Sequence, residues 1–65
     1  METIYFISES EKKSLEIMKK CLKHKISFEF LNGNEFYFYI YDDDDFQYKR
    51  KHLGDEIISE KNKVN

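Results

Sequence analysis

The sequence contains no proline and no tryptophan, only two glycines, and a single cysteine, Cys21. One cysteine excludes an intramolecular disulfide, and no apolar run approaches the roughly 20 residues that a membrane-spanning helix needs. The first residues carry neither the basic segment nor the small-residue cleavage site of a secretory signal. These absences predict a cytoplasmic protein with no membrane association.

Signatures of catalysis and metal binding are also missing. Cys21 falls on the apolar side of a predicted helix, where a packing role is expected, and His24 and His52 lie among lysines. There is no glycine-rich phosphate loop, and the run from Asp42 to Asp45 lacks the spacing and the terminal glutamate of a calcium loop. We therefore predict that the protein is not an enzyme and holds no cofactor and no metal.

What the chain does contain is aromatic and charged side chains. Of its 65 residues, 40% are hydrophobic, including six Phe and five Tyr, and 37% are charged. A chain of this size forms one domain at most, with a core that only marginally offsets conformational entropy. We expect a single domain over residues 1–65, with a small aromatic core and a frayed tail at residues 61–65.

The first half of the chain predicts a strand and then a helix. Residues 3–7 are β-branched or aromatic throughout, which is typical of a strand. Ser8 and Glu11 match the S-x-x-E capping box, so a helix over residues 9–24 is expected. At 100° per residue this helix gathers an apolar stripe, and Ile17 falls just outside it. The stripe consists of Leu15, Met18, Cys21 and Leu22.

The opposite side of the predicted helix is rich in lysine. It carries Lys12, Lys13, Lys19, Lys20 and Lys23. Glu16 lies among them at pairing distance from several. The simpler interpretation is a solvated face with a few weak ion pairs, and the functional one is a basic surface for phosphate or an acidic partner.

A β-hairpin is predicted next. Two runs of alternating residues, Ile26 to Leu31 and Glu35 to Tyr41, flank the turn sequence Asn-Gly-Asn. A two-residue turn would mix polar and apolar residues on each face. A three-residue loop, with Asn34 in the left-handed conformation, makes one face uniformly apolar, so we prefer it. The expected cross-strand pairs are Phe30 with Phe36, Phe28 with Phe38, and Ile26 with Ile40.

The preferred register creates a second, polar face on the hairpin. Tyr37, Tyr39 and Tyr41 point away from the helix, together with Glu29 and Glu35. Tyrosine is enriched at recognition surfaces because it offers a large contact area and loses little rotamer entropy. The face is therefore a candidate binding site. The alternatives are a sheet face stabilised by its own aromatic packing, or one covered by the C-terminal segment or by a second copy of the chain.

Charge is segregated along the chain. Residues 26–48 carry six carboxylates and no Lys or Arg, whereas residues 9–25 carry six lysines and three glutamates, in a chain of net charge −2. The carboxylates cluster after the predicted hairpin, at Asp42, Asp43, Asp44 and Asp45. This run is either a solvated segment that discourages aggregation or an acidic patch that faces a basic partner.

Two interpretations fit residues 46–60. The preferred one is a short strand followed by a helix, and the other is a single helix capped by Asp45 and interrupted at Gly54. In either case the basic run after the aspartates is expected to pair loosely with them. This run is Lys49, Arg50, Lys51 and His52.

Together these elements predict an α+β fold. It is a small two-layer domain in which a three- or four-stranded, mainly antiparallel sheet packs one face on the helix of residues 9–24. The expected order is β-α-β-β, followed by a short strand, a C-terminal helix or both. The predicted core comprises Ile4, Phe6, Leu15, Met18, Leu22, Ile26, Phe28, Phe30, Phe36, Phe38 and Ile40.

These surfaces favour a non-enzymatic protein-binding module, a small inhibitor or adaptor with a basic partner. In one version the carboxylates imitate the phosphates of a nucleic acid. The expected partner-binding residues are Tyr37, Tyr39, Tyr41, Asp42, Asp43, Asp44, Asp45, Glu29 and Glu35.

Two other functions remain open. A small nucleic-acid-binding protein would use its lysines on phosphates and stack tyrosines on bases. The residues for this alternative are Lys12, Lys19, Lys20, Lys23, Lys49, Arg50 and Lys51. A homodimer formed through the tyrosine face is a third option. In size and in its bias toward Lys, Asn, Ile and Glu, the chain resembles short accessory proteins of phages and mobile elements, which often occupy a site on a host protein.

Overall fold

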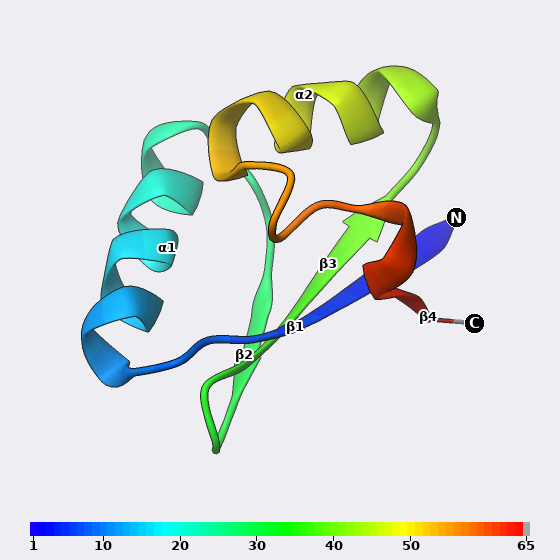
Figure 1. The fold of residues 1–65 in the computed structure, drawn as a ribbon. Coiled ribbons are helices and arrows are strands. Elements are labelled where there is room, and N and C mark those ends of the chain that lie inside the picture. The colour runs from blue at the N-terminus through cyan, green and yellow to red at the C-terminus, as the bar shows by residue number, and fades with distance from the viewer. Residues whose placement is uncertain (65) are drawn as a thin grey trace.

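A computed structural model describes residues 1–64 of the chain and gives an α+β domain with a four-stranded sheet. Both helices lie on the same side of the sheet (Figure 1). The predicted α+β fold with an antiparallel sheet packed on the first helix is confirmed. In chain order the elements are β1 (Glu2–Ile7), α1 (Glu11–Lys23), β2 (Glu29–Leu31), β3 (Glu35–Ile40), α2 (Asp43–Leu53), the 3-10 turn η1 (Glu60–Asn62) and β4 (Lys63–Val64).

The sheet has the strand order β2-β3-β1-β4, and every neighbouring pair is antiparallel. The central pair places Ile4 of β1 opposite Phe38 of β3. Because side chains alternate between the two faces of a strand, β3 reads as buried and half-buried residues in strict alternation. One face of the sheet therefore supplies the core, and the other carries the tyrosines.

The β2–β3 hairpin adopts the three-residue loop. Phe30 lies opposite Phe36, and Gly33 and Asn34 have φ values of 86° and 61°, so the predicted register is confirmed. The ladder is shorter than expected, because β2 begins only at Glu29. The predicted pairs of Phe28 with Phe38 and of Ile26 with Ile40 are therefore not part of it.

The shortening of β2 has its cause at the end of α1. The helix ends in a Schellman motif, in which the backbone N–H of Ile26 donates to the carbonyl of Cys21 at 2.8 Å. Lys25 takes the left-handed position of this motif with a φ of 57°, where glycine is more usual. Ile26 is held by this cap, so it cannot enter the ladder at the same time.

The start of α1 differs from the capping box that the sequence suggested. Ser10 is the N-cap, and its hydroxyl accepts a hydrogen bond from the backbone N–H of Lys13 at 3.0 Å. Ser8 is buried instead, and its backbone N–H donates to the carbonyl of Asn34 at 2.8 Å. Since Ser8 is committed to the hairpin loop, the predicted cap at Ser8 is wrong by two residues.

The face that α1 turns to the core is also different from the predicted stripe. Ser14, Ile17 and Cys21 are buried, whereas Leu15 and Leu22 are 57% and 75% exposed. The core assignments of Leu15 and Leu22 are therefore wrong. The physical reason is Ser14, whose hydroxyl donates to Asn34 Oδ1 at 2.9 Å and can thus occupy an inward position that an apolar pattern does not reveal.

The aspartate run begins a helix and does not end a strand. Asp42 is the N-cap of α2, and its carboxylate accepts from the backbone N–H of Asp45 at 2.8 Å. The preferred strand-then-helix interpretation of residues 46–60 is therefore wrong. The single-helix alternative is closer, although the cap is Asp42 and not Asp45. The helix ends at Gly54, which has a φ of 97°.

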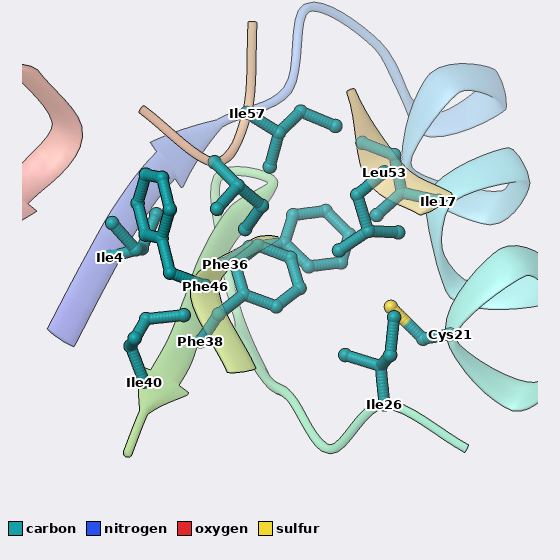
Figure 2. Close-up of a cluster of buried hydrophobic side chains, with 11 residues drawn as sticks. Ile4, Ile17, Cys21, Ile26, Phe36, Phe38, Ile40, Phe46, Leu53 and Ile57 are labelled. Carbon is teal, nitrogen blue, oxygen red and sulfur yellow. The ribbon is translucent and has the colours of Figure 1, made fainter. Parts of the chain in front are cut away.

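The core lies between the sheet and the two helices, and α2 and the segment after it complete it (Figure 2). Among the predicted core residues, Phe6, Met18 and Phe28 are only partly buried, and Phe30 is exposed at the sheet edge. The predictions confirmed as buried are Ile4, Ile26, Phe36, Phe38 and Ile40. The buried residues absent from the predicted core list are Ile17, Cys21, Phe46, Leu53, Ile57 and Ile58.

The C-terminal segment returns to the sheet. Residues 61–64 belong to η1 and to β4, which pairs with β1 through Thr3 and Val64. This differs from the frayed tail expected for residues 61–65, of which Asn65 lies outside the described residues. Neither of the two helices described in residues 1–64 combines the length and the apolar content that crossing a bilayer requires.

Candidate functional site

The candidate site is the side of the sheet that faces away from both helices, which we call the outer face. It consists of the outward positions of β1, β2 and β3, namely Thr3, Tyr5, Ile7, Glu29, Leu31, Glu35, Tyr37 and Tyr39. No helix in residues 1–64 lies over it (Figure 1). The strand alternation that buries Phe36 and Phe38 is what presents Tyr37 and Tyr39 on this side.

Tyr5 and Tyr37 form the centre of the outer face. They are cross-strand partners, and their ring centroids lie 5.0 Å apart at an interplanar angle of 47°. The Tyr5 hydroxyl donates to Glu35 Oε1 at 2.6 Å, and this hydrogen bond raises the pKa of Tyr5 to about 12. Burial, followed by a hydrogen bond to Glu29, raises the pKa of Tyr39 as well. Tyr5 and Tyr39 therefore stay neutral, and the Glu35 carboxylate holds the Tyr5 hydroxyl in place.

The fixed charge of the outer face is negative. Glu29 and Glu35 supply two carboxylates, and none of the outward positions of β1, β2 and β3 is a Lys or Arg. Ile7 and Leu31 lie on either side of Glu35 in the sheet and are exposed. These two apolar residues were missed as members of the face, although each shares strand parity with residues already placed there.

The exposed segment after the end of β3, which we call the rim, consists of Tyr41 and Asp42 to Asp44. Tyr41 follows the last residue of β3, is 73% exposed and has no partner in the β1–β3 and β2–β3 ladders. Its ring centroid lies 5.6 Å from the Lys49 ammonium of α2, so the prediction that it shares the outer face with Tyr37 and Tyr39 is wrong. Asp43 and Asp44 occupy the exposed first turn of α2. Asp42 is exposed as well, but one of its oxygens is occupied in capping the helix. The predicted run of four aspartates is thus reduced to three exposed carboxylates at the start of α2.

Asp45 does not belong to this rim. Its carboxylate accepts from the Lys49 ammonium at 2.8 Å and from the backbone N–H of Tyr41 at 2.9 Å. Partial burial acts to raise the pKa of Asp45, but these two hydrogen bonds lower it overall. Lys49 is itself buried and also donates to the carbonyl of Tyr39. The i, i+4 spacing of Asp45 and Lys49 was the sequence signal for this pair.

The basic residues lie in the other layer of the molecule. Lys12, Lys19, Lys20 and Lys23 are exposed on α1, and Arg50 and Lys51 are exposed on α2, whereas Lys49 is not at the surface. The sheet separates these side chains from the outer-face tyrosines. Within residues 1–64 the ion pairs involve only Lys49 and Lys63, so the pairs expected at Glu16 and the loose pairing of Arg50 and Lys51 with the aspartates are not formed.

The remaining reactive groups are packed among other side chains. Burial raises the pKa of the Cys21 thiol to about 11, which keeps it protonated and inert. The rings of His24 and His52 stack at 3.8 Å between the ends of the two helices. Within residues 1–64 no three His, Cys, Asp or Glu side chains are grouped closely enough to hold a metal ion. No family model, curated protein or solved structure matches the chain.

Proposed function

We propose that the protein is a non-enzymatic protein-binding module, an inhibitor or adaptor, whose outer face binds a basic surface of another protein. The single observation that carries this proposal is the composition of the outer face. One side of the sheet combines ordered tyrosines with carboxylates, has no basic side chain at its strand positions, and lies under no helix of residues 1–64.

The chemistry of this face suits Arg and Lys side chains. A guanidinium stacks well on a tyrosine ring and pairs with a neighbouring carboxylate, which the outer face offers at Tyr37, Tyr39 and Glu29. The hydrogen bond between Tyr5 and Glu35 orders this surface before binding, so little rotamer entropy remains to be lost. In this proposal the carboxylates take the place of nucleic-acid phosphates on the partner, and the module acts in the cytoplasm.

Asp43 and Asp44 are expected to contribute to binding in a different way from the tyrosines. They are exposed at the rim, so their charge adds to the attraction of a basic partner at a distance. Rim charges affect the rate of association and its salt dependence more than the final affinity. The aspartates therefore guide the encounter, and the tyrosines form the contact.

The experiment is an affinity capture with two charge-matched variants. The tagged protein serves as bait in extracts of its source, and retained proteins are compared between E29K/D43K and E9K/E16K. Both variants change the net charge equally, but only the first changes the outer face and the rim. We expect a partner with a basic surface to be retained by the parent and by E9K/E16K, and to bind E29K/D43K at least about tenfold more weakly.

Other results of this experiment would contradict the proposal. Equal retention by both variants would mean that the outer face is not the binding surface. Retention that disappears after nuclease treatment would indicate nucleic acid as the ligand. That alternative is disfavoured by the position of the lysines, because α1 and the outer-face tyrosines lie in different layers and cannot both contact one short strand.

A further inference from the structure

A second surface lies on the helix side of the molecule, between α1 and the edge strand β2. It is a hollow of about 310 Å³, which we call the α1–β2 groove. Its apolar lining is Leu15, Met18, Phe30 and Leu31, and Glu11, Ser14 and the loop from Asn32 to Asn34 complete it. Leu31 lies on the edge strand, so it borders both this groove and the outer face. This volume lies at the lower end of the range of about 300–1,000 Å³ typical of pockets that accept ligands.

The groove exists because α1 has two apolar stripes and the core uses only one. Ile17 and Cys21 face the core together with Ser14. Leu15, Met18 and Leu22 follow at i, i+3 and i+7 and form a second stripe beside it. Strand β2 lies at the sheet edge and is only three residues long, so within residues 1–64 Met18 is partly buried against the core and Leu15 and Leu22 stay exposed.

Lysines without ion-pair partners border the second stripe. Lys12 and Lys19 are three and four residues from Leu15, which makes them its neighbours on the helix surface. Lys19 is also three residues from Leu22. Since the ion pairs in residues 1–64 involve only Lys49 and Lys63, Lys12 and Lys19 form no ion pair within this part of the chain.

We infer that the α1–β2 groove binds an amphipathic peptide segment of a partner protein, with apolar anchors that enter the hollow and acidic residues that meet the lysines. The concave shape favours protruding side chains over a flat lipid surface. Glu11 lines the hollow and lies on one side of Leu15, whereas Lys12 and Lys19 lie on the other side of it. The acidic residues of the segment therefore pair on the lysine side of the anchors. A helix that inserts residues at i, i+3 and i+7 is a common occupant of such grooves. The module would then hold two proteins on opposite surfaces.

The test is an amide chemical-shift titration of the isotope-labelled protein with a defined probe. The probe is a helix-forming peptide of about 15 residues with Leu at i, i+3 and i+7 and Glu along one flank of these leucines. Its counterpart carries Lys in place of each Glu. We expect saturable shifts at Leu15, Met18, Phe30 and Leu31 with the acidic peptide, and binding at least about tenfold weaker with its basic counterpart.

Matched variants separate the groove from the rest of the molecule. Leu15 and Ile7 are 57% and 55% exposed, so L15S and I7S remove similar apolar surface on different faces. L15S should weaken binding of the acidic peptide at least about tenfold, and I7S should leave it unchanged. K12E/K19E changes only exposed side chains and should also weaken it. The variant E29K/D43K should bind this peptide like the parent, which keeps the test independent of the outer face.

Four results would overturn the inference. The acidic peptide fails to give saturable shifts in the groove, or L15S binds it as well as I7S does. Vesicles of phosphatidylcholine and phosphatidylglycerol shift the groove residues while the peptide does not, which would assign the surface to lipid. The same resonances move with protein concentration alone, which would assign it to a second copy of the chain.

Discussion

The ammonium group of Lys49 lies 2.8 Å from the carboxylate of Asp45, one turn away along α2, and both side chains are largely withdrawn from solvent. Lys49 also donates to the carbonyl of Tyr39 at the end of β3. The pair therefore joins the first turn of α2 to the last residues of the strand that carries the outer-face tyrosines. It fixes where the helix begins relative to that face.

This arrangement predicts a large stability difference between adjacent aspartates. D45A leaves the buried Lys49 ammonium without its counterion and should cost roughly 3–5 kcal/mol of unfolding free energy. D44A removes an exposed carboxylate from the first turn of the same helix and should cost about 0.3–1 kcal/mol. Urea denaturation followed by circular dichroism measures both. Equal losses in the two variants would contradict the buried pair.

A second prediction tests the orientation of α1. I17A creates a cavity beside buried Cys21 and should destabilise the fold by about 2–5 kcal/mol. L15A removes a side chain that is mostly in solvent and should cost less than about 1 kcal/mol. Thermal unfolding of the two variants decides the matter. A larger loss in L15A than in I17A would mean that the helix presents the stripe first expected from its sequence.

The contrast between Ile17 and Leu15 shows which features of the fold could be predicted from the sequence. The hairpin register followed from the pattern, because only one pairing gives Phe30 and Phe36 a common apolar face. The face of α1 did not follow, because apolar spacing alone cannot tell which of two adjacent stripes a sheet will cover. Ser14 decided it through a hydrogen bond to Asn34, a residue 20 positions away.

The prediction for the C-terminal half of the chain was wrong for a related reason. Asp42 to Asp45 were interpreted as a charged segment, but three of these residues form the first helical turn and Asp42 caps it. The spacing of Phe46 and Leu53 fits the helix, yet it also fits a strand and a later element. For the site, the tyrosine and glutamate positions on the strands were predictable from parity. The burial of Asp45 and Lys49 was not predictable, because it depends on the tertiary contact between Lys49 and the carbonyl of Tyr39.

A third prediction concerns pH and the stacked rings of His24 and His52. Burial is the main cause that lowers the pKa of His24, and the nearby His52, Lys23 and Lys20 add to it. The folded protein therefore favours neutral His24. Its contribution to stability is present above the ordinary histidine pKa of 6.5 and is lost as the pH falls through the lower folded value.

We expect the midpoint temperature of thermal unfolding to decrease as the pH is lowered from about 7 to about 5. The decrease should be smaller in H52F. Phenylalanine keeps an aromatic ring in the stack, where the Tyr48 ring also contacts position 52, but it removes the second charge. An NMR titration of His24 gives its pKa directly. A His24 pKa above 6.5, or the same loss of stability in H52F and in the parent, would contradict this account.

The most direct test of the central claim is an amide chemical-shift titration of the protein with an arginine-rich peptide and, separately, with single-stranded DNA. We expect the basic peptide to shift the outer-face resonances of Tyr5, Tyr37, Tyr39 and Glu29, E29K/D43K to reduce these shifts, and DNA to leave the outer face unchanged. Peptide shifts confined to acidic residues elsewhere, such as Glu9, Glu16 and Asp55, or saturable DNA-induced shifts at Tyr37 and Tyr39, would contradict it.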